Sequence, residues 1–133
     1  MKHILLTMII LIAYSNTTMA NNIIVQQLIE DYKSQGASSG KTQTGEQVWN
    51  KEFPGKAPFA TRSCTTCHTS NLNAKGKHIR TGKAIKPMSP SINKQRLAGI
   101  KKVNKWFKRN CKWTLGRECT AQEKLDLLTF INQ

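Results

Sequence analysis

The sequence predicts an all-α fold with long loops, and three observations support that class. Apolar residues recur three and four positions apart in several segments, which is the spacing of one helix face. No run of alternating β-branched residues indicates a strand. Stretches rich in Gly, Lys, Ser and Pro separate the periodic segments, as loops do.

The first twenty residues have the pattern of a secretory signal peptide. Lys2 and His3 precede an apolar run over 4–14, and the small residues Thr18 and Ala20 lie where cleavage is expected. The apolar run is short for a membrane span. We therefore expect cleavage after about Ala20 and a mature protein that is soluble in the periplasm, with an uncleaved N-terminal anchor as the alternative.

Two helices are expected in the first part of the mature chain. Apolar residues at every fourth position predict a short helix over 22–33. The small polar stretch 34–45 is typical of a linker. A second helical stretch is centred on 48–49, and the prolines that follow it would end it.

Two further helices are expected after a long connection over 71–92. The first covers about 94–111, and the last runs from 120 to about 132. The last helix begins with a capping box, Thr120 to Glu123. Its apolar face would consist of Leu125, Leu128 and either Phe130 or Ile131. So few helices make a poor core, and the chain needs another source of buried apolar volume.

The motif Cys-Thr-Thr-Cys-His over 64–68 is that of c-type haem attachment. On one helical turn, the thiols of Cys64 and Cys67 can each bond one haem vinyl group. The His68 imidazole can then bind the iron, as the usual proximal ligand. We therefore predict one covalently bound haem c, which also supplies the missing apolar volume.

Other uses of the cysteines fit less well. A thioredoxin-like pair would need a βαβ context, which the pattern lacks. A zinc site would need a second closely spaced pair, whereas Cys111 and Cys119 are too far apart. A disulfide between Cys64 and Cys67 would close a strained small loop. Cys111 and Cys119 can pair with each other in an oxidising compartment, as a structural staple or as a redox-active pair.

The ligand on the far side of the iron decides between an electron carrier and a gas-binding site. Met88, in "KPMSPS", would give the usual thioether ligation of small cytochromes c, or would pack on the haem as a soft apolar side chain. His78 is a weaker candidate, because its lysine-rich, glycine-containing segment is typical of an exposed surface.

Asn110 is the unusual candidate for this ligand. Val103, Trp106 and Phe107 form one helix face, and Asn110 continues that face with a polar amide. A buried amide without a partner costs about 1–3 kcal/mol. It should therefore bind either the chain near a helix end or a group in the haem pocket, where Trp106 and Phe107 would pack near the haem.

Several segments together resemble the sphaeroides haem protein family of monohaem cytochromes c. They are "VQQLIEDYK", "CTTCHTS", "RTGKAIKPMSPS" and "VNKWFKRNCKWTLGRECTAQEKLDLLTFI", and they cover nearly the whole mature chain in order. The "NCKWTLGRECT" stretch is specific to the family, whereas the haem motif is not. The resemblance implies a class I cytochrome c fold, which we place at 45–133 after an N-terminal helix and linker at 21–44.

The resemblance also implies the iron ligands. In the family the motif histidine binds the iron together with an asparagine, which leaves on reduction so that oxygen or nitric oxide can bind. That asparagine matches Asn110, and the family's disulfide matches Cys111 and Cys119. The family's usual residue at the Met88 position is leucine, so a methionine there could compete for the iron. An ordinary electron carrier with His68 and Met88 as ligands is therefore the alternative function.

The formal net charge of +14 at pH 7 favours a negatively charged partner, or serves only solubility. The lysines are scattered and an exported chain rarely meets nucleic acid, so we expect no nucleic-acid binding. The resemblance implies a dihaem cytochrome c as redox partner, which would suit a basic surface if that partner is acidic. No general acid is evident near the motif, so electron transfer with ligand binding is expected before oxygen or nitric-oxide reductase activity.

Overall fold

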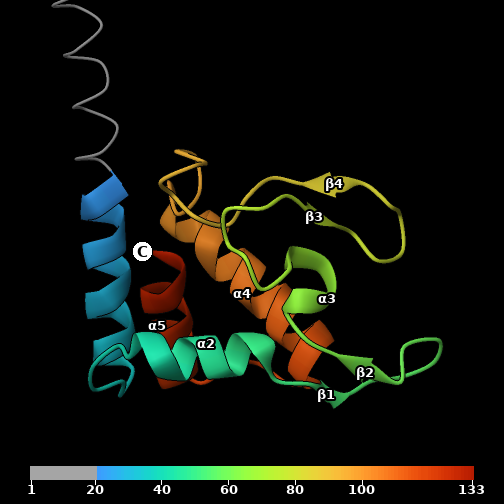
Figure 1. The fold of residues 1–133 in the computed structure, drawn as a ribbon. Coiled ribbons are helices and arrows are strands. Elements are labelled where there is room, and N and C mark those ends of the chain that lie inside the picture. Colours follow the sequence, from blue (N-terminus) through green and yellow to red (C-terminus); the bar gives the residue numbers. More distant parts are fainter. Residues whose placement is uncertain (1–20) are drawn as a thin grey trace, which may run out of the picture.

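The computed structural model describes residues 21–133, so the signal peptide predicted over 1–20 lies outside the described residues. Residues 21–34 are helical. The other helices are α2 (Thr42–Asn50), α3 (Thr65–His68), α4 (Ile100–Leu115) and α5 (Ala121–Ile131). The predicted all-α class is confirmed (Figure 1). Within residues 21–133 no helix has the length and apolar character to cross a bilayer.

Two short antiparallel strand pairs depart from the expectation of no strands. β1 (Phe53–Pro54) pairs with β2 (Thr61–Arg62), and β3 (Gly76–Lys77) pairs with β4 (Ala84–Ile85). Strands of two residues are too short to show an alternating pattern. The β3–β4 hairpin lies beside α3 (Figure 1).

α4 begins and ends later than the expected range of 94–111. Residues 94–97 form turns instead, and Leu97 has a positive φ of 58°. The helix continues to Leu115 and ends at Gly116, whose φ of 76° is a left-handed conformation that glycine adopts readily. Asn110 therefore lies inside α4 and not at its end.

The capping box predicted for the last helix is confirmed. Thr120 Oγ1 accepts a hydrogen bond from the Glu123 backbone N at 3.1 Å, and Glu123 Oε2 accepts one from the Thr120 backbone N at 2.8 Å. The start of α2 lies inside the expected linker. There the Lys41 backbone N donates to Asp126 Oδ1 of α5 at 2.8 Å, a distant partner that the local sequence does not reveal.

One apolar core joins the helix over 21–34 to α2, α4 and α5. Its largest fully buried side chains are Leu28, Tyr32, Leu125 and Leu128. Tyr32 Oη also donates a hydrogen bond to Asn104 Oδ1 of α4 at 2.7 Å. α2 and α5 cross closely at Gly45, where a Cβ would collide with the Asp126 backbone. The N-terminal helix thus shares its core with the segments that carry the haem motif and Asn110.

Candidate haem site

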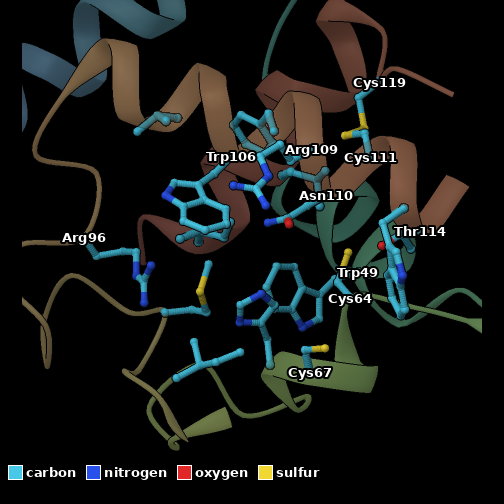
Figure 2. A pocket seen from close by; sticks show the side chains of 18 of the residues that line it. Trp49, Cys64, Cys67, Arg96, Trp106, Arg109, Asn110, Cys111, Thr114 and Cys119 are labelled. Atoms are coloured by element: carbon cyan, nitrogen blue, oxygen red, sulfur yellow. A yellow bond between two sulfur atoms is a disulfide. The ribbon is translucent and has the colours of Figure 1, made fainter. Parts of the chain in front are cut away.

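A cavity of about 600 Å³ lies between α4, α3 and the β3–β4 hairpin (Figure 2). Such a volume suits a cofactor-sized ligand, and much of the wall is apolar. Every side chain predicted for the site lines this cavity: Cys64, Cys67, His68, Met88, Trp106, Phe107, Asn110, Cys111 and Cys119. The fold therefore brings together residues from widely separated parts of the chain.

The haem motif forms the short helix α3 in the cavity wall. The turn starts at Ser63, whose backbone N donates to Thr66 Oγ1 at 3.0 Å, and it continues with the His68 backbone N donating to Cys64 O at 3.1 Å. Cys64 and Cys67 are both free thiols. Burial raises the pKa of the Cys64 thiol to about 12, so this thiol stays protonated. Two thiols on one turn are thus available on one cavity wall.

The His68 imidazole packs beside Trp49, with the two ring centroids 5.5 Å apart. Trp49 is itself fixed, because its Nε1 donates to Thr69 O at 2.9 Å. Burial, and secondly the positive charge of Arg96, lower the pKa of His68 to about 4. The ring is therefore neutral near pH 7, which is the form that binds a metal. Its Nδ1 is buried and has no hydrogen-bond partner among the described residues.

Gly76 in β3 packs against the back of the motif. A Cβ at this position would collide with the Cys67 carbonyl oxygen and lie 3.0 Å from the His68 Cα. Glycine is required for that approach. No sequence signal identified this role, since a lone glycine in a loop is common.

Asn110 reaches the cavity from α4. Figure 2 shows its amide pointing into the cavity, with Cys67 entering from the opposite side. Asn110 is exposed at the cavity, and not buried as its place on an apolar helix face suggested. Five residues of α4 follow Asn110, so its interpretation as a helix-end residue is wrong. Trp106 and Phe107 lie on the same wall, and Trp106 is 45% exposed there.

Met88 is tied to the segment that follows the motif and not to α4. Its backbone N donates to Leu72 O at 2.9 Å, and Leu72 lies four residues after His68. The preceding carbonyl, that of Pro87, accepts hydrogen bonds from Arg96 Nε at 3.2 Å and from Arg96 Nη2 at 3.1 Å. The loop that carries Met88 is therefore held to the segment that follows the motif.

His78 lies in the β3–β4 hairpin, where it is half-buried and lines the cavity. Most of the surrounding segment is exposed, as expected, whereas His78 itself is partly covered. Its Nδ1 already contacts Thr81, 3.2 Å from the backbone N and 3.1 Å from Oγ1. These contacts leave Nε2 as the only ring nitrogen for another partner.

Cys111 and Cys119 form the expected disulfide, with their Cα atoms 5.5 Å apart. The disulfide joins the last turns of α4 to the residue that precedes the Thr120 cap of α5. Lys112 Nζ and Glu118 Oε1 form an ion pair at 3.1 Å across the same loop. Together these links fix the last turns of α4, in which Cys111 directly follows Asn110.

Positive side chains surround the cavity. Those that line it are Arg80, Arg96, Lys102, Arg109 and Lys112, and no Asp or Glu of the described chain joins them. The Arg109 guanidinium carbon lies 5.1 Å from the Trp106 ring centroid. The sequence pattern did not identify these cations or Trp49 as site residues, because single arginines and aromatics carry no spacing signal.

Several known proteins resemble this chain over most of its length. A family model described as a domain of unknown function, DUF1924, matches residues 35–131. The cytochrome c-type protein SHP of Cereibacter sphaeroides is 37% identical over 105 residues, which cover 79% of this chain and 80% of that protein.

Two solved structures align over most of the chain. The structure of oxidized SHP, described as an oxygen-binding cytochrome c, has a TM-score of 0.74 and 35% identity, and covers 81% of this chain and 95% of that one. The solution structure of Methylophilus methylotrophus cytochrome c'' has a TM-score of 0.69 and 28% identity, and covers 80% and 90%.

Fold and site therefore define a helical monohaem cytochrome of the c type. The chain belongs to the sphaeroides haem protein family, as the sequence resemblance predicted. Its cofactor is haem c, and the residues present fit that group. Two free thiols line the cavity, and the adjacent imidazole has a buried Nδ1 without a partner.

Proposed function

We propose that this protein is an exported electron-transfer cytochrome that also binds small diatomic ligands. Cys64 and Cys67 hold the haem through thioether bonds, His68 binds the iron, and Asn110 is a second, displaceable ligand. When bound, the haem supplies one-electron redox chemistry and a coordination position that a diatomic gas can take.

The Asn110 amide carries this proposal. It enters the cavity from α4, on the side across from Cys67 (Figure 2). With a haem in the cavity the amide loses contact with water, and an unpaired buried amide costs about 1–3 kcal/mol. An amide oxygen is a hard donor that suits ferric iron better than the softer ferrous iron. Reduction should therefore release Asn110.

The position of Met88 supports Asn110 over the alternative ligand. The Met88 backbone is bonded to Leu72 O, in the segment that follows His68, and Arg96 holds the Pro87 carbonyl just before it. A second iron ligand would have to come from a part of the cavity other than the one that carries His68. A methionine whose backbone is bonded to the segment after His68 is better placed to pack against the haem as a soft apolar side chain.

The relatives agree with ligand exchange at the iron. The solved structure of SHP is described as that of an oxygen-binding cytochrome c. The solution structure of cytochrome c'' is described as giving insight into haem-ligand detachment. We extend both properties to this chain because Asn110 supplies a ligand that can detach.

The proposed location and partner rest on the sequence. We propose cleavage after about Ala20, export to the periplasm and electron exchange with an acidic dihaem cytochrome c. The formal net charge of +14 supports an acidic partner. Electron transfer between the two purified proteins should slow as salt is added, since screening weakens their attraction. A rate that does not depend on salt would contradict an acidic partner.

Carbon monoxide tests the proposed ferrous site. Mixing it with the reduced protein should change the absorption spectrum at once, because a released Asn110 would leave a coordination position free. No rapid change would overturn gas binding. Steady-state consumption of oxygen or nitric oxide with a reductant separates turnover from binding.

Two variants test which residue is the ferric ligand. Asn110→Ala should change the ferric absorption spectrum, whereas Met88→Leu, which keeps a similar apolar volume, should not. The opposite result would assign the ordinary electron carrier with His68 and Met88 as ligands.

A further inference from the structure

Arg109 is a cation next to Asn110 on α4 that the proposed function does not use. Figure 2 shows its guanidinium extending into the cavity from the same helix as the Asn110 amide. The guanidinium carbon lies 5.1 Å from the ring centroid of Trp106, within the range of a cation–π contact. Trp106 lies three residues earlier, so the two side chains are neighbours on the helix surface. The contact holds Arg109 at the cavity.

Arg109 has no counter-charge within residues 21–133, where it forms no salt bridge. Two other cations of the wall are already engaged. Arg96 donates to the Lys86 carbonyl oxygen at 2.8 Å, and Lys112 pairs with Glu118 at 3.1 Å. Arg109 is therefore available to a ligand in the cavity.

A bound haem carries two propionate groups, and these would neutralise only part of the positive charge on this wall. Five cationic side chains and no Asp or Glu of the described chain line the cavity. Both propionates can be matched by cations while positive charge remains in excess. A cleft with one sign of charge concentrates small ions of the opposite sign. A guanidinium also donates charge-assisted hydrogen bonds to an anion.

We propose that Arg109 makes the Asn110 side of the cavity a binding site for small inorganic anions, which it favours over neutral gases. The inference rests on the proposed function, since in the oxidised protein the anion has to displace the weak ligand Asn110. The ligand class is a small monovalent anion that can bind iron through one end and accept a hydrogen bond from Arg109. Azide is a suitable probe.

Azide is charged and carbon monoxide is neutral. Comparing their affinities therefore separates the effect of the Arg109 charge from a general change in the cavity. Arg109→Gln should weaken azide binding to the oxidised, haem-loaded protein about tenfold, the loss expected for one charge-assisted hydrogen bond. The same variant should leave the carbon monoxide affinity of the reduced protein unchanged, because that ligand is neutral. Arg109→Lys keeps the charge and should bind azide with intermediate affinity.

Lys105→Gln is the matched control. It removes one positive charge from an exposed position of the same helix that does not line the cavity. Salt screens such an exposed charge, so the azide affinity should change less than about twofold. Added salt should slow azide association with the unmodified protein more than with the Arg109→Gln variant.

Three results would overturn the role of Arg109. Equal loss of azide affinity in Arg109→Gln and Lys105→Gln would show a general effect of surface charge. Unchanged azide affinity in Arg109→Gln would leave the guanidinium as a propionate partner. Parallel loss of azide and carbon monoxide binding would show that Arg109 only supports the cavity. Failure of the proposed function looks different, because the unmodified reduced protein would then not bind carbon monoxide.

Discussion

Arg96 donates two hydrogen bonds to the Pro87 carbonyl oxygen, from Nε at 3.2 Å and from Nη2 at 3.1 Å. Nη2 also donates to Lys86 O at 2.8 Å, so one guanidinium fixes the backbone just before Met88. The positive charge of Arg96 also helps to lower the pKa of His68, after the larger effect of burial. The arginine thus links the Met88 loop to His68.

Arg96→Met should destabilise the haem-loaded protein by about 2 kcal/mol, because hydrogen bonds from a charged donor to two backbone carbonyls are lost. Urea unfolding measures the change. Arg80→Met is the control, since it removes another cation of the cavity wall that forms no ion pair within residues 21–133. Equal losses in the two variants would contradict the structural role of Arg96.

Gly76→Ala should lower the yield of covalently haem-loaded protein, because the added Cβ collides with the Cys67 carbonyl and displaces the motif. Overpacking of this kind costs about 1–3 kcal/mol. Gly99→Ala is the control, since its Cβ would meet only the Lys102 Cβ, at an ordinary 3.8 Å. The ratio of haem absorbance to protein gives the readout. Equal yields from both variants would show that the β3–β4 hairpin does not position the motif.

Replacing Cys111 and Cys119 together by serine should lower the free energy of unfolding by about 2.5 kcal/mol, because a short closed loop no longer restricts the unfolded chain. Urea unfolding of the two haem-loaded proteins measures this difference. A structural staple leaves the reduction potential of the haem independent of added dithiol. A potential that follows the dithiol concentration in the unmodified protein would indicate a redox-active pair.

Glu123 gives the stability a dependence on pH. Its side-chain hydrogen bonds with Arg117, at 2.7 and 2.8 Å, are the main cause of a lowered pKa. A carboxyl group whose pKa is lower in the folded state stabilises the fold above its unfolded pKa, here 4.5. That contribution disappears as the pH falls through the folded pKa.

Glu123→Gln should therefore reduce the loss of stability on acidification below about pH 4.5. Thermal unfolding across that range provides the measurement. The exposed carboxylate of Glu46 forms no ion pair within residues 21–133, and Glu46→Gln is the control. Identical pH profiles for the unmodified protein and Glu123→Gln would contradict the pH-dependent stabilisation by Glu123.

The features that the sequence predicted correctly depend on local spacing. The motif over 64–68 and the capping box over 120–123 each span no more than five consecutive residues, so they can be recognised without knowledge of distant contacts. The haem motif uses Cys64 and Cys67, so Cys111 and Cys119 were the cysteines that remained to pair. The polar position of Asn110 on an apolar face was visible from helical periodicity alone.

The features that were missed depend on contacts between distant segments. The start of α2 is fixed by Asp126, 85 residues from Lys41, and the packing of Gly76 depends on the motif turn. The end of α4 is an exception, because a local residue, Gly116, ends the helix after Leu115, beyond the expected range of 94–111. Arg96 and Arg109 could not be recognised, since an arginine shows its partners only in three dimensions.

The coordination number of the iron in the two redox states tests the role of Asn110 most directly. Resonance Raman spectra of the oxidised and reduced protein report it. A displaceable Asn110 predicts six-coordinate ferric iron that becomes five-coordinate on reduction, and Asn110→Ala should remove the ferric ligand. Iron that stays six-coordinate in both states, with the same spectra in Asn110→Ala, would contradict that role.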